Sequence, residues 1–128
     1  MIDHFAKKLN DLVHAKKPVT LGLIAKELQC TALEAAHVLP AENCSFVKPE
    51  VEFESVWSEL CTWERVTFFV IHEGHVFEIV TKLSPGKSAM GYYNILHADA
   101  TLGGHIKADA ISEMAFISMP FMGRESHY

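Results

Sequence analysis

The spacing of apolar residues changes near the middle of the chain, and this change constrains the fold more than any other feature. Before it, apolar side chains recur every three or four residues, as at Ile2 and Phe5, which is typical of amphipathic helices. After it, β-branched and aromatic residues form continuous runs, as in 66–71, which is typical of strands. This order indicates an α+β fold in which N-terminal helices, within 1–63, pack on a large antiparallel β-sheet formed by 64–128.

The first half of the chain predicts four helices. Thr31 and Glu34 have the spacing of a capping box, in which each side chain satisfies the free backbone N–H of the other residue. Pro18 and Pro40 mark the ends of two helices, because proline lacks the amide hydrogen that a helix interior needs. The expected helices cover 2–15, 21–28, 32–39 and 50–62, with a loop between the last two.

The second half predicts a hairpin and three further strands. Glu73-Gly74 is a turn signal between two runs of strand-forming residues, 66–71 and 76–81. Ser84-Pro85-Gly86 indicates another turn. The remaining strands are expected at 88–96, 104–110 and 113–119.

The composition is ordinary for a soluble domain. The 128 residues fit one domain, and 49% of them are hydrophobic and 21% charged. The net charge of −5 argues against nucleic acid as the main partner, because phosphate binding requires a basic surface. The first residues lack the pattern of a signal peptide and no apolar run reaches the length of a membrane span, so a cytoplasmic protein is expected.

The three cysteines predict free thiols. Cys30, Cys44 and Cys61 lie far apart, and their number is odd. This pattern suits a reducing compartment better than a disulfide framework, and the spacing matches no zinc motif. We therefore expect buried or half-buried thiols without a chemical role.

Residues 20–39 have the proportions of a helix-turn-helix, with two short helices, a tight turn and the small residue Ala25. The pattern indicates either DNA binding or a helical subdomain that packs on the sheet. The second helix has no arginine, lysine, asparagine or glutamine to read bases, which favours the packing role.

His72-Glu73-Gly74-His75 lacks the spacing of a helical metal motif and is expected to be a solvated turn.

Polar and aromatic side chains gather in the last third of the chain. Tyr92 and Tyr93 occupy adjacent strand positions, so their side chains point to opposite faces, one toward the core and one toward a surface or cleft. His105 follows two glycines that would let a flat ligand approach the backbone closely. Arg124 is able to pair with a carboxylate. Taken one at a time, these residues also fit ordinary core or surface positions.

An ordered set of short motifs runs along nearly the whole chain. The motifs are Leu39-Pro40, Trp57, Cys61-x-Trp63, Val66-Thr67, Phe77-Glu78, Pro85-Gly86, Gly91-Tyr92-Tyr93-Asn94, Gly104-His105-Ile106-Lys107 and Phe121-Met122-Gly123-Arg124-Glu125-Ser126. By these motifs the chain resembles the cytosolic haem-utilisation carrier family, the HutX/ChuX-like proteins. Each motif alone is weak, but the ordered set is specific, especially its last three members.

The resemblance implies an α+β protein that forms a homodimer and binds haem, here b-type and ferric. It places Tyr92 at the family's iron-ligating tyrosine and His105 at a histidine that contributes to haem binding. A phenolate is a hard anionic ligand that favours ferric iron, while histidine supplies a second ligand or donates a hydrogen bond that orients the first. By the same resemblance Lys107 and Arg124 would neutralise the haem propionates, and Met90 would supply an apolar wall. Further apolar walls are expected from Phe68, Phe77 and Phe121.

The function that the resemblance implies is non-catalytic transport of haem inside bacteria. The implied partners are haem, a haem-uptake or haem-degrading protein, and a second copy of the chain. The alternatives are a haem-degrading enzyme, by similarity to larger double-repeat haem-handling proteins, and a helix-turn-helix module for DNA binding or protein interaction. Family members continue beyond the position of Tyr128 into further strands and a helix. We therefore expect a single domain over 1–128 that lacks this C-terminal segment, either because the sequence is a fragment or because the protein is shortened.

Overall fold

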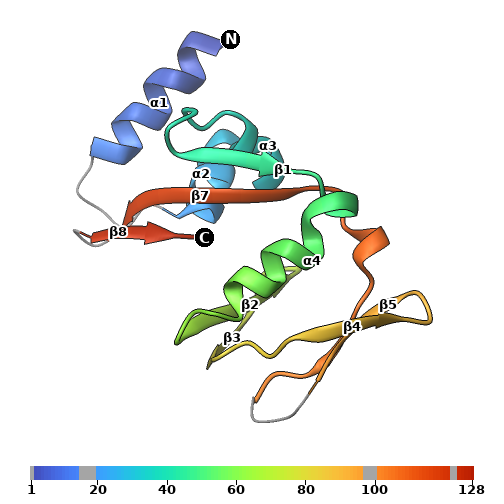
Figure 1. The fold of residues 1–128 in the computed structure, drawn as a ribbon. Coiled ribbons are helices and arrows are strands. Elements are labelled where there is room, and N and C mark those ends of the chain that lie inside the picture. Colours follow the sequence, from blue (N-terminus) through green and yellow to red (C-terminus); the bar gives the residue numbers. More distant parts are fainter. Residues whose placement is uncertain (1, 15–19, 97–100, 122–123) are drawn as a thin grey trace. The chain divides into compact units, whose positions relative to one another are not determined.

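The computed structural model consists of helices and antiparallel strands, which confirms the α+β class (Figure 1). The described residues are 2–14, 20–96, 101–121 and 124–128. They divide into two compact units. The first unit combines Met1–Val47 with Met114–Tyr128, and the second is the continuous segment Lys48–Glu113. Among the described residues the strands form three sheets, two of three strands and one of two strands.

Three helices open the first unit. They are α1 (Ile2–His14), α2 (Leu21–Leu28) and α3 (Ala32–His37). Thr20 caps α2, because its hydroxyl accepts a hydrogen bond from the backbone N–H of Leu23 at 3.1 Å. The capping box expected at the start of α3 is confirmed. The Thr31 hydroxyl accepts from the Glu34 N–H at 3.2 Å, and the Glu34 carboxylate accepts from the Thr31 N–H at 2.8 Å.

The first unit also contains a sheet with the strand order β1-β7-β8. These strands are β1 (Cys44–Val47), β7 (Met114–Phe121) and β8 (Arg124–His127), and each pair is antiparallel. The buried core combines residues of α2 and α3 with residues of β7. It consists of Ile24, Ala25, Leu28, Ala35, Ala36, Ile117 and Met119. The two short helices therefore pack on a sheet, as one interpretation of residues 20–39 predicted.

Strands β1 and β8 differ from the sequence-based prediction. β1 lies where a loop is predicted, and β8 lies beyond the last predicted strand. Each has four residues, too few for an alternating pattern to stand out. Distant residues hold β1 in place: Cys44 pairs with Ile117, and the Asn43 side-chain amide donates to the Ser118 carbonyl at 2.9 Å. Helix α3 ends at His37 rather than at residue 39, while residue 15 lies outside the described part of the chain.

The second unit begins with a helix and a hairpin. These elements are α4 (Pro49–Leu60), β2 (Val66–His72) and β3 (His75–Thr81). The predicted hairpin is confirmed, since Glu73 and Gly74 form its turn with φ angles of 48° and 82°, as a two-residue turn between twisted strands requires. Beyond the end of α4, the Lys82 ammonium donates to the carbonyls of Cys61 at 2.9 Å and Trp63 at 3.2 Å, which satisfies free acceptors there.

The last sheet of the second unit has the strand order β4-β5-β6. Its elements are β4 (Gly86–Ala89), β5 (Tyr92–Ile95) and β6 (Gly104–Ile106), followed by the short 3₁₀ helix η1 (Ala108–Ala110). The single strand predicted over 88–96 is in fact a hairpin, because Met90 and Gly91 form a turn with φ angles of 55° and 80°. Methionine rarely adopts a positive φ, so this pair is a weak turn signal. The strand predicted over 104–110 ends at Ile106, where η1 follows after one residue.

Helix α4 packs against one face of this sheet. The rings of Phe53 and Trp57 meet the buried ring of Tyr93 edge-on, with centroid distances of 5.3 and 6.1 Å. The Trp57 indole N–H donates to the Ser84 carbonyl at 2.8 Å, so its only polar atom is satisfied. This packing assigns one face of the sheet to the core of the second unit and leaves the face of Tyr92 exposed.

Candidate functional site

The two adjacent tyrosines face opposite sides of β5, as the sequence predicted. Tyr93 is 4% exposed and belongs to the core, whereas Tyr92 is 43% exposed. The alternation continues along the strand, since Asn94 is half-buried and Ile95 is buried. Tyr92 and Asn94 therefore share one face of the β4-β5-β6 sheet, which we call the open face.

His105 joins Tyr92 on the open face. It is the cross-strand partner of Asn94, so its side chain projects from the same side of the sheet. The Tyr92 and His105 rings lie edge to face, with a centroid distance of 6.1 Å and an interplanar angle of 72°. The structure thus brings together the two predicted iron-binding side chains, which are 13 positions apart in the sequence.

Asn94 connects these groups to the backbone. Its Nδ2 lies 3.0 Å from the carbonyl oxygen of Lys87 and 3.2 Å from those of Ala89 and Tyr92. Its Oδ1 lies 2.7 Å from Nδ1 of His105. Asn94 belongs to one of the motifs that the chain shares with the haem-utilisation carriers, but the motif alone predicted no role for it. The register of the β4–β5 hairpin would have indicated its position, had the Met90-Gly91 turn been recognised.

Two lysines lie in this sheet region: Lys87 on β4 and Lys107 directly after β6. The Lys107 ammonium is 3.1 Å from the Asp109 carboxylate, and both side chains are largely exposed. An anionic ligand would therefore have to compete with Asp109 for this charge. Lys87, which the sequence analysis did not single out, is exposed and is the cross-strand partner of Asn94, so it contributes a cation to the open face.

The residues predicted to form apolar walls are dispersed. Met90 forms the tip of the β4–β5 hairpin and is 97% exposed. Phe68 and Phe77 share one face of the β2–β3 hairpin, where Phe68 is half-buried and Phe77 is 63% exposed. The side chain of Phe121 lies outside the described part of the structure.

Arg124 begins β8 in the first unit, whereas the open face belongs to the second unit. It is the cross-strand partner of Phe121, and its side chain is exposed. The guanidinium is therefore accessible to an anionic group, and its predicted role with a propionate stays a prediction.

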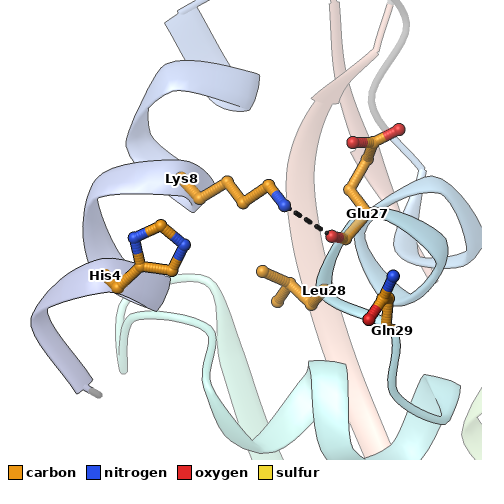
Figure 2. A pocket seen from close by; sticks show the side chains of 5 residues that line it. All are labelled: His4, Lys8, Glu27, Leu28 and Gln29. Carbon is orange, nitrogen blue, oxygen red and sulfur yellow. Dashed lines mark hydrogen bonds between the residues drawn. The ribbon is translucent and has the colours of Figure 1, made fainter.

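A pocket of about 260 Å³ lies in the first unit, between α1 and the end of α2 (Figure 2). Its lining residues are His4, Lys8, Glu27, Leu28 and Gln29. The Lys8 ammonium donates to the Glu27 carbonyl at 2.8 Å, so a cation from α1 satisfies a free acceptor near the C-terminus of α2. None of the predicted ligand-binding residues lines this pocket. The Lys8–Glu27 hydrogen bond beside it joins α1 to α2.

The histidine motif in the β2–β3 hairpin is an exposed turn, as expected. His72 and His75 are cross-strand partners, and the His72 imidazole is 3.7 Å from the Glu73 carboxylate. No group of three or more histidine, cysteine or acidic side chains in the described residues is placed to hold a metal ion. No described helix has the length and apolar character needed to cross a membrane.

The described thiols are free, as predicted. Burial raises the pKa of the Cys44 thiol above its usual value. Burial also raises the pKa of Cys61, although the nearby charge of Lys82 opposes this effect. Both thiols are therefore protonated at neutral pH, which suits a packing role rather than nucleophilic chemistry.

Comparison with known proteins identifies the family. Residues 46–128, which contain the open face and Arg124, match the family model for haem utilisation ChuX/HutX proteins. The chain belongs to the ChuX/HutX family. Over 127 residues it is 32% identical to HutX of Vibrio cholerae, which is named an intracellular heme transport protein. The alignment covers 99% of this chain and 65% of that relative, so the chain spans slightly less than two thirds of its length.

Solved structures share the fold of this ChuX/HutX chain. A protein from Erwinia carotovora gives a TM-score of 0.79 at 28% identity, covering 93% of this chain and 73% of that protein. A structure of ChuX, described as a heme binding protein, gives a TM-score of 0.75 at 29% identity, with coverages of 93% and 72%. The resemblance found in the sequence is thereby confirmed.

Proposed function

We propose that this chain binds haem and carries it within the cytoplasm. The observation that supports the proposal most directly is the pairing of Tyr92 with His105 on the open face, inside the segment that matches the haem-utilisation family. The V. cholerae relative named as an intracellular heme transport protein, and the structure described as a heme binding protein, support the same function.

The donor atoms of the open face fit haem iron. Tyr92 offers a phenol that becomes a hard anionic ligand on losing its proton, which favours ferric iron, and His105 offers an imidazole nitrogen. Tyr92 is 43% exposed, and His105 is exposed as well, so a planar ligand can reach both. We assign Tyr92 as the iron ligand and His105 as its supporting residue or second ligand, with b-type haem as the cargo.

Cations near the open face suit the propionates of haem. Lys87 lies on this face by its register with Asn94, and Lys107 follows His105 by two residues. The exposed Lys107–Asp109 pair contributes little stability, so exchange of Asp109 for a propionate costs little. Arg124, in the first unit, is a separate exposed cation that would bind a carboxylate through two parallel hydrogen bonds.

An exposed site favours a carrier over an enzyme. A carrier must release its ligand, and Tyr92 and His105 are both exposed on their sheet. Haem breakdown would require groups that steer oxygen chemistry at a sheltered iron. Incubation of the haem complex with a reductant separates the two functions, because an enzyme would steadily lose the Soret band and release product.

A second copy of the chain is the proposed protein partner. The β2–β3 hairpin carries a surface formed by Phe69, Ile71, Val76 and Val80, with exposed fractions of 44%, 69%, 54% and 59%. We call this surface the hairpin apolar face. Glu78, the cross-strand partner of Phe69, is the charged side chain on the same face. Exposed apolar side chains gathered in this way mark interaction sites more often than free surface. A homodimer through this face would remove them from water, and a haem-uptake or haem-degrading protein is a further proposed partner.

A titration with hemin, followed through the Soret band, tests haem binding. We expect saturable binding to the unmodified chain and a loss of affinity of at least about tenfold for Tyr92→Phe and for His105→Ala, because each removes a proposed iron contact. Tyr128→Phe and His75→Ala are matched controls, since these residues are also exposed but lie outside the open face. Absence of saturable binding, or equal affinities for all four variants, would contradict the proposal.

A further inference from the structure

The side-chain amide of Asn94 has a defined orientation. Three backbone carbonyl oxygens, those of Lys87, Ala89 and Tyr92, surround one end of it at 3.0 to 3.2 Å. Carbonyl oxygens only accept hydrogen bonds, so the end that faces them must be the NH₂ group. The amide oxygen of Asn94 is consequently the atom that faces His105.

This orientation determines which nitrogen of His105 carries the proton. Nδ1 of His105 lies 2.7 Å from Oδ1 of Asn94, within the range of a hydrogen bond. An amide oxygen cannot donate, so Nδ1 must be the donor. In the neutral imidazole the other nitrogen, Nε2, is then without a proton and presents its lone pair.

The backbone around Asn94 supports this arrangement from three strands. Asn94 pairs with Lys87 of β4 on one side and with His105 of β6 on the other. The positive φ angles of Met90 and Gly91 close the β4–β5 hairpin and bring the carbonyl of Ala89 to the amide. Asn94 itself is half-buried, and its side chain reaches carbonyls of β4 and β5 and the His105 ring of β6.

We propose that Asn94 is a positioning residue that holds His105 as the Nδ1–H tautomer and thereby presents the Nε2 lone pair on the open face. The inference deepens the proposed haem function and rests on it for the identity of the ligand. Neutral His105 then acts at Nε2 as a ligand to iron or as the acceptor of a hydrogen bond. It does not donate a hydrogen bond from Nε2 to the Tyr92 phenolate, which excludes one of the roles considered from the sequence.

Nitrogen NMR of the protein without haem tests the tautomer directly. In protein labelled with ¹⁵N-histidine, long-range proton–nitrogen correlations at a pH where His105 is neutral distinguish a protonated ring nitrogen from one with a lone pair. We expect Nδ1–H for His105 in the unmodified chain. Mainly Nε2–H would overturn the proposal, and this measurement needs no variant to fold.

Two variants at Asn94 test the positioning role. Asn94→Leu removes the acceptor at nearly constant size, so we expect His105 to lose its preference for Nδ1–H and hemin affinity to fall about tenfold. Asn94→Asp keeps an oxygen acceptor toward Nδ1 of His105 but places its second oxygen against the three carbonyls, so we expect Nδ1 to stay protonated while stability to urea falls. Asn43→Leu is the matched control, because Asn43 also donates to a backbone carbonyl, at 2.9 Å, but contacts no predicted ligand.

The two proposals fail in different ways. The role of Asn94 would be overturned if His105 kept its tautomer in Asn94→Leu. It would also be overturned if hemin affinity were unchanged in Asn94→Leu but lost in His105→Ala. Haem binding would be unaffected by either result. The opposite outcome is also possible to distinguish. If the unmodified chain fails to bind hemin, but His105 is the Nδ1–H tautomer and loses this preference in Asn94→Leu, haem is not the ligand. The positioning of His105 by Asn94 is then still supported.

Discussion

At the scale of single residues, two tyrosines of identical chemistry have opposite roles because of their strand positions. The Tyr93 hydroxyl accepts a hydrogen bond from the Gly86 N–H at 2.9 Å, and its ring packs against Phe53 and Trp57. Tyr92 keeps its hydroxyl on the exposed side of the sheet. Burial of one tyrosine thus fixes the orientation of the other, and the core of the second unit positions the proposed iron ligand.

Gly86 permits this packing, and its replacement should destabilise the second unit. A Cβ atom at Gly86 would lie 2.5 Å from the Asn94 carbonyl oxygen and 2.6 Å from a ring carbon of Tyr93. Since both neighbours are held by the hairpin and the core, we expect Gly86→Ala to lower the free energy of unfolding by about 1–3 kcal/mol in urea titrations. Gly22→Ala in α2 is the control, because its Cβ would lie 3.9 Å from the Thr20 hydroxyl oxygen, an ordinary contact distance, and alanine favours a helix. Equal stability of both variants would contradict the close contact at Gly86.

At the scale of elements, the start of α3 makes stability depend on pH. The Glu34 carboxylate accepts hydrogen bonds from the Thr31 backbone N–H and the Thr31 hydroxyl. Both hold the pKa of Glu34 below its usual value, and the backbone hydrogen bond has the larger effect. A carboxyl group whose pKa is lowered by folding stabilises the protein above its unfolded pKa, and this contribution is lost as pH falls through the folded pKa. We expect Glu34→Gln to weaken the loss of stability in acid, measured by unfolding at several values between about pH 3 and 7.

Two further variants complete this test of the capping box. Thr31→Ala removes the cap of α3 and should cost about 1 kcal/mol at neutral pH. Glu42→Gln, which changes an exposed glutamate outside the helices, is the control for the loss of a negative charge. The assignment would be wrong if Glu34→Gln and Glu42→Gln gave the same dependence of stability on pH.

The elements that local chemistry defines could be predicted from the sequence. The capping box of α3, the turn at Glu73-Gly74 and the opposite faces of the two tyrosines each depend on residues at most three positions apart. Strand β1 depends instead on β7, about 70 residues later, so its four residues carry little local signal. The contact between Asn94 and His105 likewise depends on the register of β5 and β6 and could not be read from composition or spacing.

At the scale of the whole molecule, the hairpin apolar face should govern self-association. Ile71 and Val76 are cross-strand partners at the end of this face next to the hairpin turn. We expect the unmodified chain to form a homodimer and the double variant Ile71→Lys with Val76→Lys to be monomeric in sedimentation velocity, because the two added charges would have to lose their hydration at the interface. Val51→Lys, which charges an exposed apolar residue of α4, should leave the dimer intact. A monomeric unmodified chain at every concentration, or a dimer unaffected by the double variant, would contradict this interface.

The alternation along β5 also limits how this part of the chain can change during evolution. Insertion or deletion of one residue between the Met90-Gly91 turn and Tyr93 would reverse the faces of all following side chains in the strand. Tyr93 would then replace Tyr92 on the exposed side, and Asn94 would point away from His105. Substitutions can therefore accumulate singly in this strand, but a change in its length disrupts the core and the proposed ligand site together.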